Sequence, residues 1–78
     1  MKLWIEHHKS QITIRARECE GYTFDRETAK RLSVREIENV LKGQFSRHAV
    51  GKCFWRAAIE VQNVAITGKS VVLELEPC

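Results

Sequence analysis

Three histidines and three cysteines are the side chains of this sequence that could ligate a metal or pair as nucleophile and base: His7, His8, His48, Cys19, Cys53 and Cys78. Zinc sites usually place two ligands a few positions apart, as in C-x-x-C or H-x-x-x-H, and no such pair occurs here. His7 and His8 are adjacent, and adjacent side chains of a strand point to opposite faces. We therefore expect no metal site and no cofactor. No acid–base or Cys–His motif is present either, which indicates a protein that is not an enzyme.

A second candidate for chemistry is Gly68-Lys69-Ser70, which matches the last positions of a phosphate-binding loop. That loop needs an earlier glycine, where this chain has Asn63, and it must lead into a helix. The residues that follow, 71–75, have the pattern of a strand. We interpret the three residues as a turn and expect no nucleotide site.

The composition is that of an ordinary globular protein, with 78 residues, 44% apolar residues, 29% charged residues and a net charge of +3. This length predicts one domain, residues 1–78, with a thin stability margin that association with a second copy would widen. We find no apolar run of the roughly 20 residues that a membrane span needs, and no signal peptide. Three widely spaced cysteines favour reduced thiols and a cytoplasmic location. So small a protein suits a bacterial or phage origin.

The elements that must position any functional side chain begin with two strands, predicted over residues 2–8 and 11–18. In the second strand, Ile12, Ile14 and Ala16 alternate with polar residues, a period of two. Lys9-Ser10 lies between the strands and can close a hairpin. Glu20-Gly21 is then expected to end the strand pattern.

Two helices are predicted next. Asp25 is a suitable cap for a first helix over residues 26–32. Ser33 and Glu36 have the spacing of a capping box, in which each side chain accepts from the backbone N–H of the other residue. The second helix therefore starts at Ser33 and ends at Gly43 or Phe45. Its apolar stripe must lie on the sheet.

The last third of the chain reads as two further strands, residues 54–66 and 70–76, joined by a type II′ hairpin turn over residues 67–70. Alternation points Trp55 inward and Phe54 outward, and a β-bulge near residues 62–63 accounts for a change of phase. The expected fold is thus a small α+β domain with element order ββααββ. One or two helices pack on one face of an antiparallel four-stranded sheet.

The outward face of that sheet has an unusual composition for a solvated surface, because it combines aromatic residues with arginines. The residues expected to form a partner-binding surface on it are Trp4, Arg15, Arg17, Phe54 and Arg56. Tryptophan, phenylalanine and arginine are enriched at protein interfaces and their hot spots. The alternative is that Trp4 or Phe54 merely covers a sheet edge.

A second basic surface lies in the centre of the chain, where residues 26–56 carry eight basic and three acidic side chains. Its helical part offers a candidate phosphate-binding set: Arg26, Lys30, Arg35 and Lys42. Interleaved glutamates favour a solvated, salt-bridged helix surface instead. A helix-turn-helix is disfavoured, since Asn39 and Lys42 are polar where that motif needs apolar residues.

The sequence therefore predicts a non-enzymatic binding protein, an inhibitor or adaptor type of modulator that acts on a larger protein, or a homodimer that associates through the same face. The alternative is nucleic-acid binding, either by the arginines and aromatic residues of the sheet or by the basic helical segment. Salt dependence separates these two functions, because phosphate contacts weaken steeply as ionic strength rises.

Overall fold

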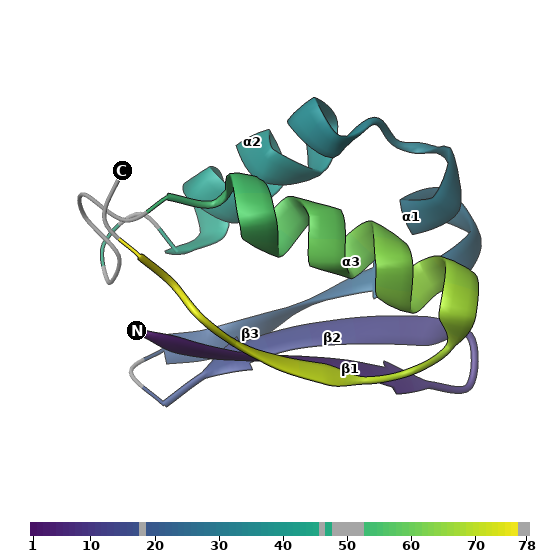
Figure 1. Ribbon diagram of the computed structural model, residues 1–78, viewed down its shortest axis with the longest axis horizontal. Helices are drawn as coiled ribbons and strands as arrows, with labels where there is room; N and C mark the ends of the chain where they lie inside the picture. Colours follow the sequence, from purple (N-terminus) through teal and green to yellow (C-terminus); the bar gives the residue numbers. More distant parts are fainter. Residues whose placement is uncertain (18, 46, 48–52, 77–78) are drawn as a thin grey trace.

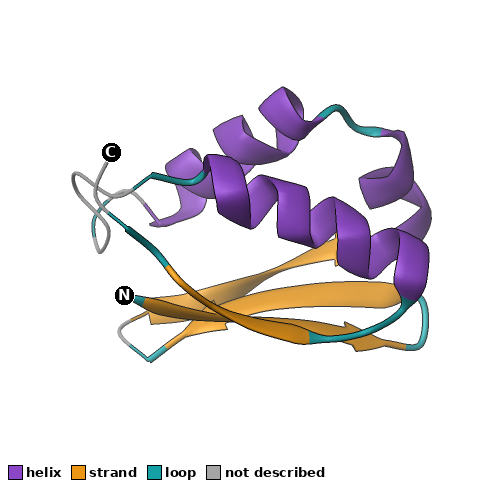
Figure 2. Cartoon of the chain, in the orientation of Figure 1, coloured by secondary structure: helices purple, strands orange, loops and turns teal. Residues whose placement is uncertain are grey.

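The computed structural model describes residues 1–17, 19–45, 47 and 53–76. Its elements are β1 (Lys2–His8), β2 (Gln11–Ala16), β3 (Cys19–Asp25), α1 (Arg26–Arg31), α2 (Val34–Phe45), α3 (Trp55–Thr67) and β4 (Val71–Glu74). The four strands form one antiparallel sheet in the order β3-β2-β1-β4. All three helices lie on one face of that sheet (Figure 1 and Figure 2). The predicted α+β class and its four-stranded antiparallel sheet are confirmed.

The predicted order of elements, ββααββ, is wrong, because the described chain runs βββαααβ. The third strand is β3, which passes through Gly21, where the sequence pattern was expected to break. The segment 54–66, predicted to be a strand, belongs almost entirely to α3. His48 and Cys78, two of the candidate ligands, lie outside the described residues.

The helical period of α3 explains that correction. Its buried residues follow the spacing of one helix face: Ala57, Ala58, Val61, Val64 and Ala65. This single pattern covers the whole segment without the β-bulge that the strand interpretation needed. The β-branched residues of the segment favour a strand locally, and burial against the sheet overrides that preference. Helix α3 lies between α2 and the sheet, packing on both (Figure 1).

The two predicted helix starts are confirmed. The Asp25 carboxylate accepts from the backbone N–H of Thr28 at 3.1 Å and caps α1. The Ser33 hydroxyl accepts from the N–H of Glu36 at 3.2 Å, and the Glu36 carboxylate accepts from the N–H of Ser33 at 3.1 Å. Leu32 is extended (φ −72°, ψ 147°), so α1 and α2 are separate helices.

Two connections lie at the same end of the sheet, and one agrees with prediction whereas the other differs. Lys9 and Ser10 close the β1–β2 hairpin, with Lys9 at φ 56°. Gly68, expected in a hairpin turn, instead ends α3 in the left-handed conformation (φ 75°), and its N–H donates to the Val64 carbonyl at 2.8 Å. The chain then enters β4, which pairs with β1 at an edge of the sheet.

The core lies between the sheet and the helices. Alternate residues of β1 and β2 point into it, among them Leu3, Ile5 and Ile14, and helix α2 contributes Ile37 and Leu41. None of the described helices is both long and apolar enough to cross a membrane. Because the helices cover only one face, alternation leaves the other half of the strand side chains on a face that no described element covers (Figure 2).

Candidate functional site

The uncovered face of the sheet has Trp4 at its centre. Trp4 lies on β1 between two buried residues, so its side chain points away from the helices. Its neighbour across the β1–β2 pairing is Arg15, and its neighbour across the β1–β4 pairing is Val72, which is 58% exposed. We call the surface formed by Lys2, Trp4, Glu6, Thr13, Arg15, Arg17, Val72 and Glu74 the open face.

Three cationic side chains surround the Trp4 ring. The Arg15 guanidinium carbon lies 5.1 Å from the ring centroid, the Arg17 guanidinium carbon 5.8 Å, and the Lys2 ammonium 5.9 Å. All three distances fall within the range of a cation–π interaction. The cations therefore cluster around an aromatic ring that is itself only partly exposed. This arrangement holds the charged groups near one another instead of letting them spread into solvent.

These cations differ in their partners. The Arg15 Nε donates to the Glu6 carboxylate at 2.7 Å. That hydrogen bond, and then the negative charge of Glu6, raise the pKa of Arg15 above its ordinary value, so Arg15 stays charged at every physiological pH. Within the described chain, Lys2 and Arg17 have no carboxylate at ion-pair distance. Glu74 pairs with the Met1 ammonium at 2.7 Å.

A hollow of about 270 Å³ lies at the end of the open face where Lys2 and Arg17 meet. Its lining also includes Met1 and Glu74. At the opposite end, a second hollow of about 350 Å³ has a different, mixed polar lining: Glu6, His7, His8, Gln11, Thr13 and Ser70. Among the described residues, the open face is thus polarised along the strands, with the cations that have no ion-pair partner there, Lys2 and Arg17, at one end.

Gly21 makes room for Arg15 on this surface. The β2–β3 pairing is irregular between Ile14 and Ala16, so that one residue of β2 faces two of β3, as in a β-bulge. A Cβ atom at Gly21 would lie 2.8 Å from the Ile14 carbonyl oxygen and 3.2 Å from the Arg15 Cβ. The glycine is therefore required for the close approach of β3 to β2 beside Arg15.

Of the five residues predicted to form the partner-binding surface, the structure brings three together: Trp4, Arg15 and Arg17. The prediction is wrong for Phe54 and Arg56. Phe54 is 2% exposed and stacks on Phe45, with ring centroids 6.4 Å apart. Arg56 lies in α3 on the helical side of the sheet. Both errors follow from reading α3 as a strand.

The candidate phosphate-binding set does not form one free cationic surface. The Arg26 Nε donates to the Ala65 carbonyl at 2.8 Å, and the Arg26 Nη1 lies 3.1 Å from the His7 Nε2. This arginine therefore connects α1 to α3 and β1. Lys30 pairs with Glu27 at 3.4 Å, and Lys42 with Glu38 at 3.8 Å. Of the four, only Arg35 has neither a side-chain hydrogen bond nor an ion pair within the described part of the chain.

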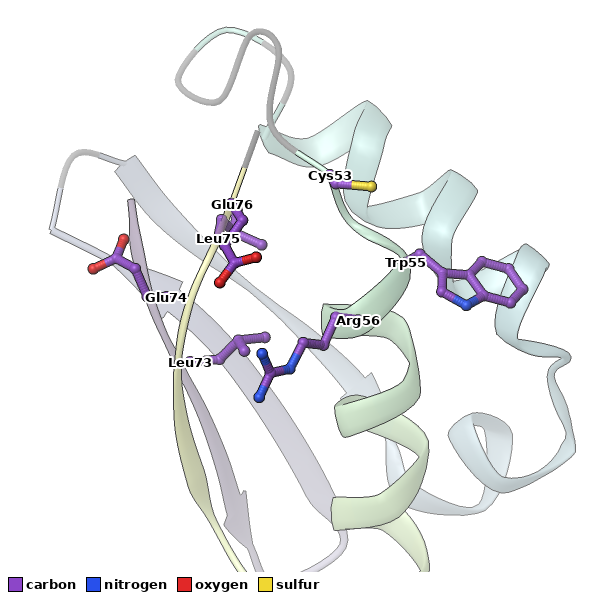
Figure 3. A pocket seen from close by; sticks show the side chains of 7 residues that line it. All are labelled: Cys53, Trp55, Arg56, Leu73, Glu74, Leu75 and Glu76. Atoms are coloured by element: carbon purple, nitrogen blue, oxygen red, sulfur yellow. The ribbon is translucent and has the colours of Figure 1, made fainter. Parts of the chain in front are cut away.

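Sequence reasoning missed a cavity of about 210 Å³ between the start of α3 and the end of β4 (Figure 3). Its lining residues are Cys53, Trp55, Arg56, Leu73, Glu74, Leu75 and Glu76. The Arg56 side chain extends toward Leu73, whereas the Trp55 indole turns away from β4 (Figure 3). No signal in the sequence pointed here, because the strand interpretation placed Trp55 in the core. The described residues contain no group of three metal-ligating side chains, here or elsewhere.

Comparisons of this chain with protein-family models, with curated proteins and with solved structures found no significant match.

Proposed function

We propose that this protein is a non-enzymatic binding protein that recognises a larger protein through the open face of its sheet. The observation that carries the proposal is the position of Trp4 at the centre of that face, with Lys2, Arg15 and Arg17 around its ring. Tryptophan and arginine dominate the binding energy of protein interfaces, and hot spots lie near the centre of the contact. The Trp4 cluster has this composition and this central place.

The geometry also supports a partner other than a second copy. If two open faces met with their cationic ends together, the Lys2, Arg15 and Arg17 cations of one copy would approach those of the other. Juxtaposed like charges cost several kcal/mol at an interface. We therefore expect the protein to be a monomer when its partner is absent. A solution mass near 9.0 kDa in sedimentation equilibrium checks this.

Nucleic-acid binding has less support. Base-stacking platforms present bare aromatic faces, and here cations surround the tryptophan ring at the centre of the open face. Two carboxylates, Glu6 and Glu74, also lie on that face, where they would repel a continuous line of phosphates. The helical alternative is weaker still, since three of its four cations are bonded within the protein.

The test uses two matched variants. Trp4→Thr removes the central ring and keeps a residue that favours strands. Trp55→Thr removes the other tryptophan, which is 45% exposed on the helical side. Tagged wild-type protein and both variants are used to capture partners from the cells of origin, with and without nuclease. We expect a nuclease-resistant protein partner that is retained by Trp55→Thr and lost by Trp4→Thr.

Two results of this capture would overturn the proposal. The first is a partner that both variants retain equally, because the open face would then have no part in binding. The second is a partner that disappears on nuclease treatment and whose binding falls steeply with salt, which assigns the open face to nucleic acid. The circular dichroism spectrum of each variant confirms that it is folded.

A further inference from the structure

We infer that the partner presents an extended segment to the open face, with a carboxylate side chain in the hollow beside Lys2 and Arg17 and an apolar side chain on Trp4 and Val72. This inference rests on the proposed function and names the chemistry of the partner. Three features of the structure support it: the ion-pair partners of the cations, the size of the hollow and the spacing of residues along β1.

The cations around Trp4 are not equally available to an incoming anion. Arg15 is already hydrogen bonded to Glu6. Lys2 and Arg17 line one hollow, and neither has a carboxylate at ion-pair distance within the described chain. An incoming anion therefore meets two unpaired cations at that end of the face. Their positions near the Trp4 ring lower the entropic cost of holding them around a ligand.

The hollow beside Lys2 and Arg17 is large enough to hold a side chain of the partner. The hollow of about 270 Å³ is several times the roughly 30 Å³ that one water molecule occupies in the liquid. A carboxylate side chain can enter it without displacing protein atoms. Glu74 lines the same hollow, where its carboxylate is paired with the Met1 ammonium at 2.7 Å, so Lys2 and Arg17 are the cations left for an incoming anion. A carboxylate has two acceptor oxygens, one for each of these two cations.

The spacing of residues along β1 determines the spacing of the side chains that the partner must present. Lys2 and Trp4 are two residues apart on β1, which corresponds to about 6.6 Å at about 3.3 Å per residue. Val72 is paired with Trp4 across the β1–β4 pairing and is 58% exposed. The two side chains therefore offer apolar surface next to the hollow beside Lys2 and Arg17. An extended partner has the same repeat, so its acidic and apolar side chains would stand at positions i and i+2. The partner signature is thus an acidic residue, any residue, and then an apolar residue.

The test uses a defined probe, a fluorescein-labelled peptide of three repeats of Glu-Ser-Val-Ser, and the same peptide with Gln in place of Glu. Binding is measured by fluorescence anisotropy at low salt. Lys2→Gln with Arg17→Gln removes the two unpaired cations. The control, Arg31→Gln with Arg35→Gln, removes two exposed cations from the helical side and causes the same change in net charge. Oligo(dT) of similar length is the nucleic-acid probe.

We expect the Glu peptide to bind wild-type protein and the Gln peptide to bind at least tenfold more weakly. The Lys2/Arg17 variant should lose about tenfold in affinity for the Glu peptide, as two surface ion pairs of up to about 1 kcal/mol each allow. The Arg31/Arg35 control should change it less than twofold. Trp4→Thr should weaken both peptides by a similar factor, since both carry the valines.

Four results would overturn the inference. No binding of the Glu peptide, or an equal loss in both double variants, means that the hollow recognises no carboxylate. Tighter binding of oligo(dT), lost in the Lys2/Arg17 variant, means that the anion is a phosphate. The proposed function fails separately, in the capture experiment with Trp4→Thr. A partner that needs Trp4 but tolerates loss of Lys2 and Arg17 refutes the acidic segment and leaves the protein-binding function standing.

Discussion

Two adjacent residues, Phe54 and Trp55, should have opposite sensitivities to truncation. Phe54 is 2% exposed and stacks on Phe45 in the core, whereas Trp55 is 45% exposed at the start of α3. Replacement of a buried phenylalanine by alanine costs about 3–5 kcal/mol. A protein of this length has a total stability of about 4–12 kcal/mol, at about 0.05–0.15 kcal/mol per residue. Phe54→Ala should therefore remove a quarter or more of the stability.

Trp55→Ala should cost much less. Complete burial of a large apolar side chain is worth about 1.5–3 kcal/mol, and roughly half of that applies to a side chain that is half exposed. We expect a loss of about 1 kcal/mol. The larger residue thus has the smaller effect, which is the opposite of what a strand with Trp55 inward and Phe54 outward would give.

The assay is urea denaturation followed by circular dichroism at 222 nm. Small proteins have m-values of about 1–3 kcal/mol per molar urea, so Phe54→Ala should lower the midpoint by at least about 1 M. Trp55→Ala should lower it by less than half as much. If Trp55→Ala were the more destabilising of the two, or if both variants stayed within 0.5 M of wild type, the assignment of Phe54 to the core would be refuted.

Three further substitutions test the helices and strands that support the open face. Ser33→Ala removes the hydroxyl that caps α2 and should lower the free energy of unfolding by about 1 kcal/mol, which urea denaturation would detect; an unchanged midpoint would mean that the capping box contributes nothing. Gly43→Ala should raise stability by up to about 1 kcal/mol, because Gly43 lies within α2 and an added Cβ would meet nothing within 4 Å. Gly21→Ala should lower it, because its Cβ would press on Ile14 and Arg15. In thermal melts, the melting temperature should rise for Gly43→Ala and fall for Gly21→Ala. A shift of the same sign in both variants would contradict the role of Gly21 in the β2–β3 bulge.

The sequence predicted those parts of the fold that depend on local signals. The alternation of residues 11–16, the Asp25 cap and the Ser33–Glu36 capping box each involve side chains a few positions apart, and each is present in the structure. Signals of this kind can be recognised from neighbouring residues alone, without knowledge of the rest of the fold. They defined where the strands and helices of the first half begin.

The errors came from segments whose structure depends on distant contacts. In α3, the β-branched residues suit a strand as well as a helix, and only the sheet beneath makes the helix face containing Ala57, Val61 and Val64 the better choice. In β3, Gly21 resembles a break when considered alone. Its value appears only once β3 packs beside β2 and the glycine admits Arg15.

The candidate site was predicted in part for the same reason. Trp4 and Arg15 lie on the first two strands and Arg17 directly follows the second, where alternation was correct, so their common face could be deduced. Phe54 and Arg56 depended on the third predicted strand, which is a helix. Lys2 was not predicted, although alternation places it on the same face as Trp4; its position beside Arg17 requires the register of β1 against β2 and the hollow that the chain forms there with β4.

The most direct test of the open face as the binding surface is ¹⁹F NMR of the protein labelled with 5-fluorotryptophan. The chain has two tryptophans, Trp4 on the open face and Trp55 on the helical side, so each spectrum contains its own control. The Trp55→Phe variant assigns the two signals, and an unlabelled partner contributes none. On addition of the captured partner, we predict that the Trp4 signal shifts and loses its sensitivity to solvent isotope, while the Trp55 signal stays unchanged. A shift of the Trp55 signal alone would place the interface on the helices and contradict the account.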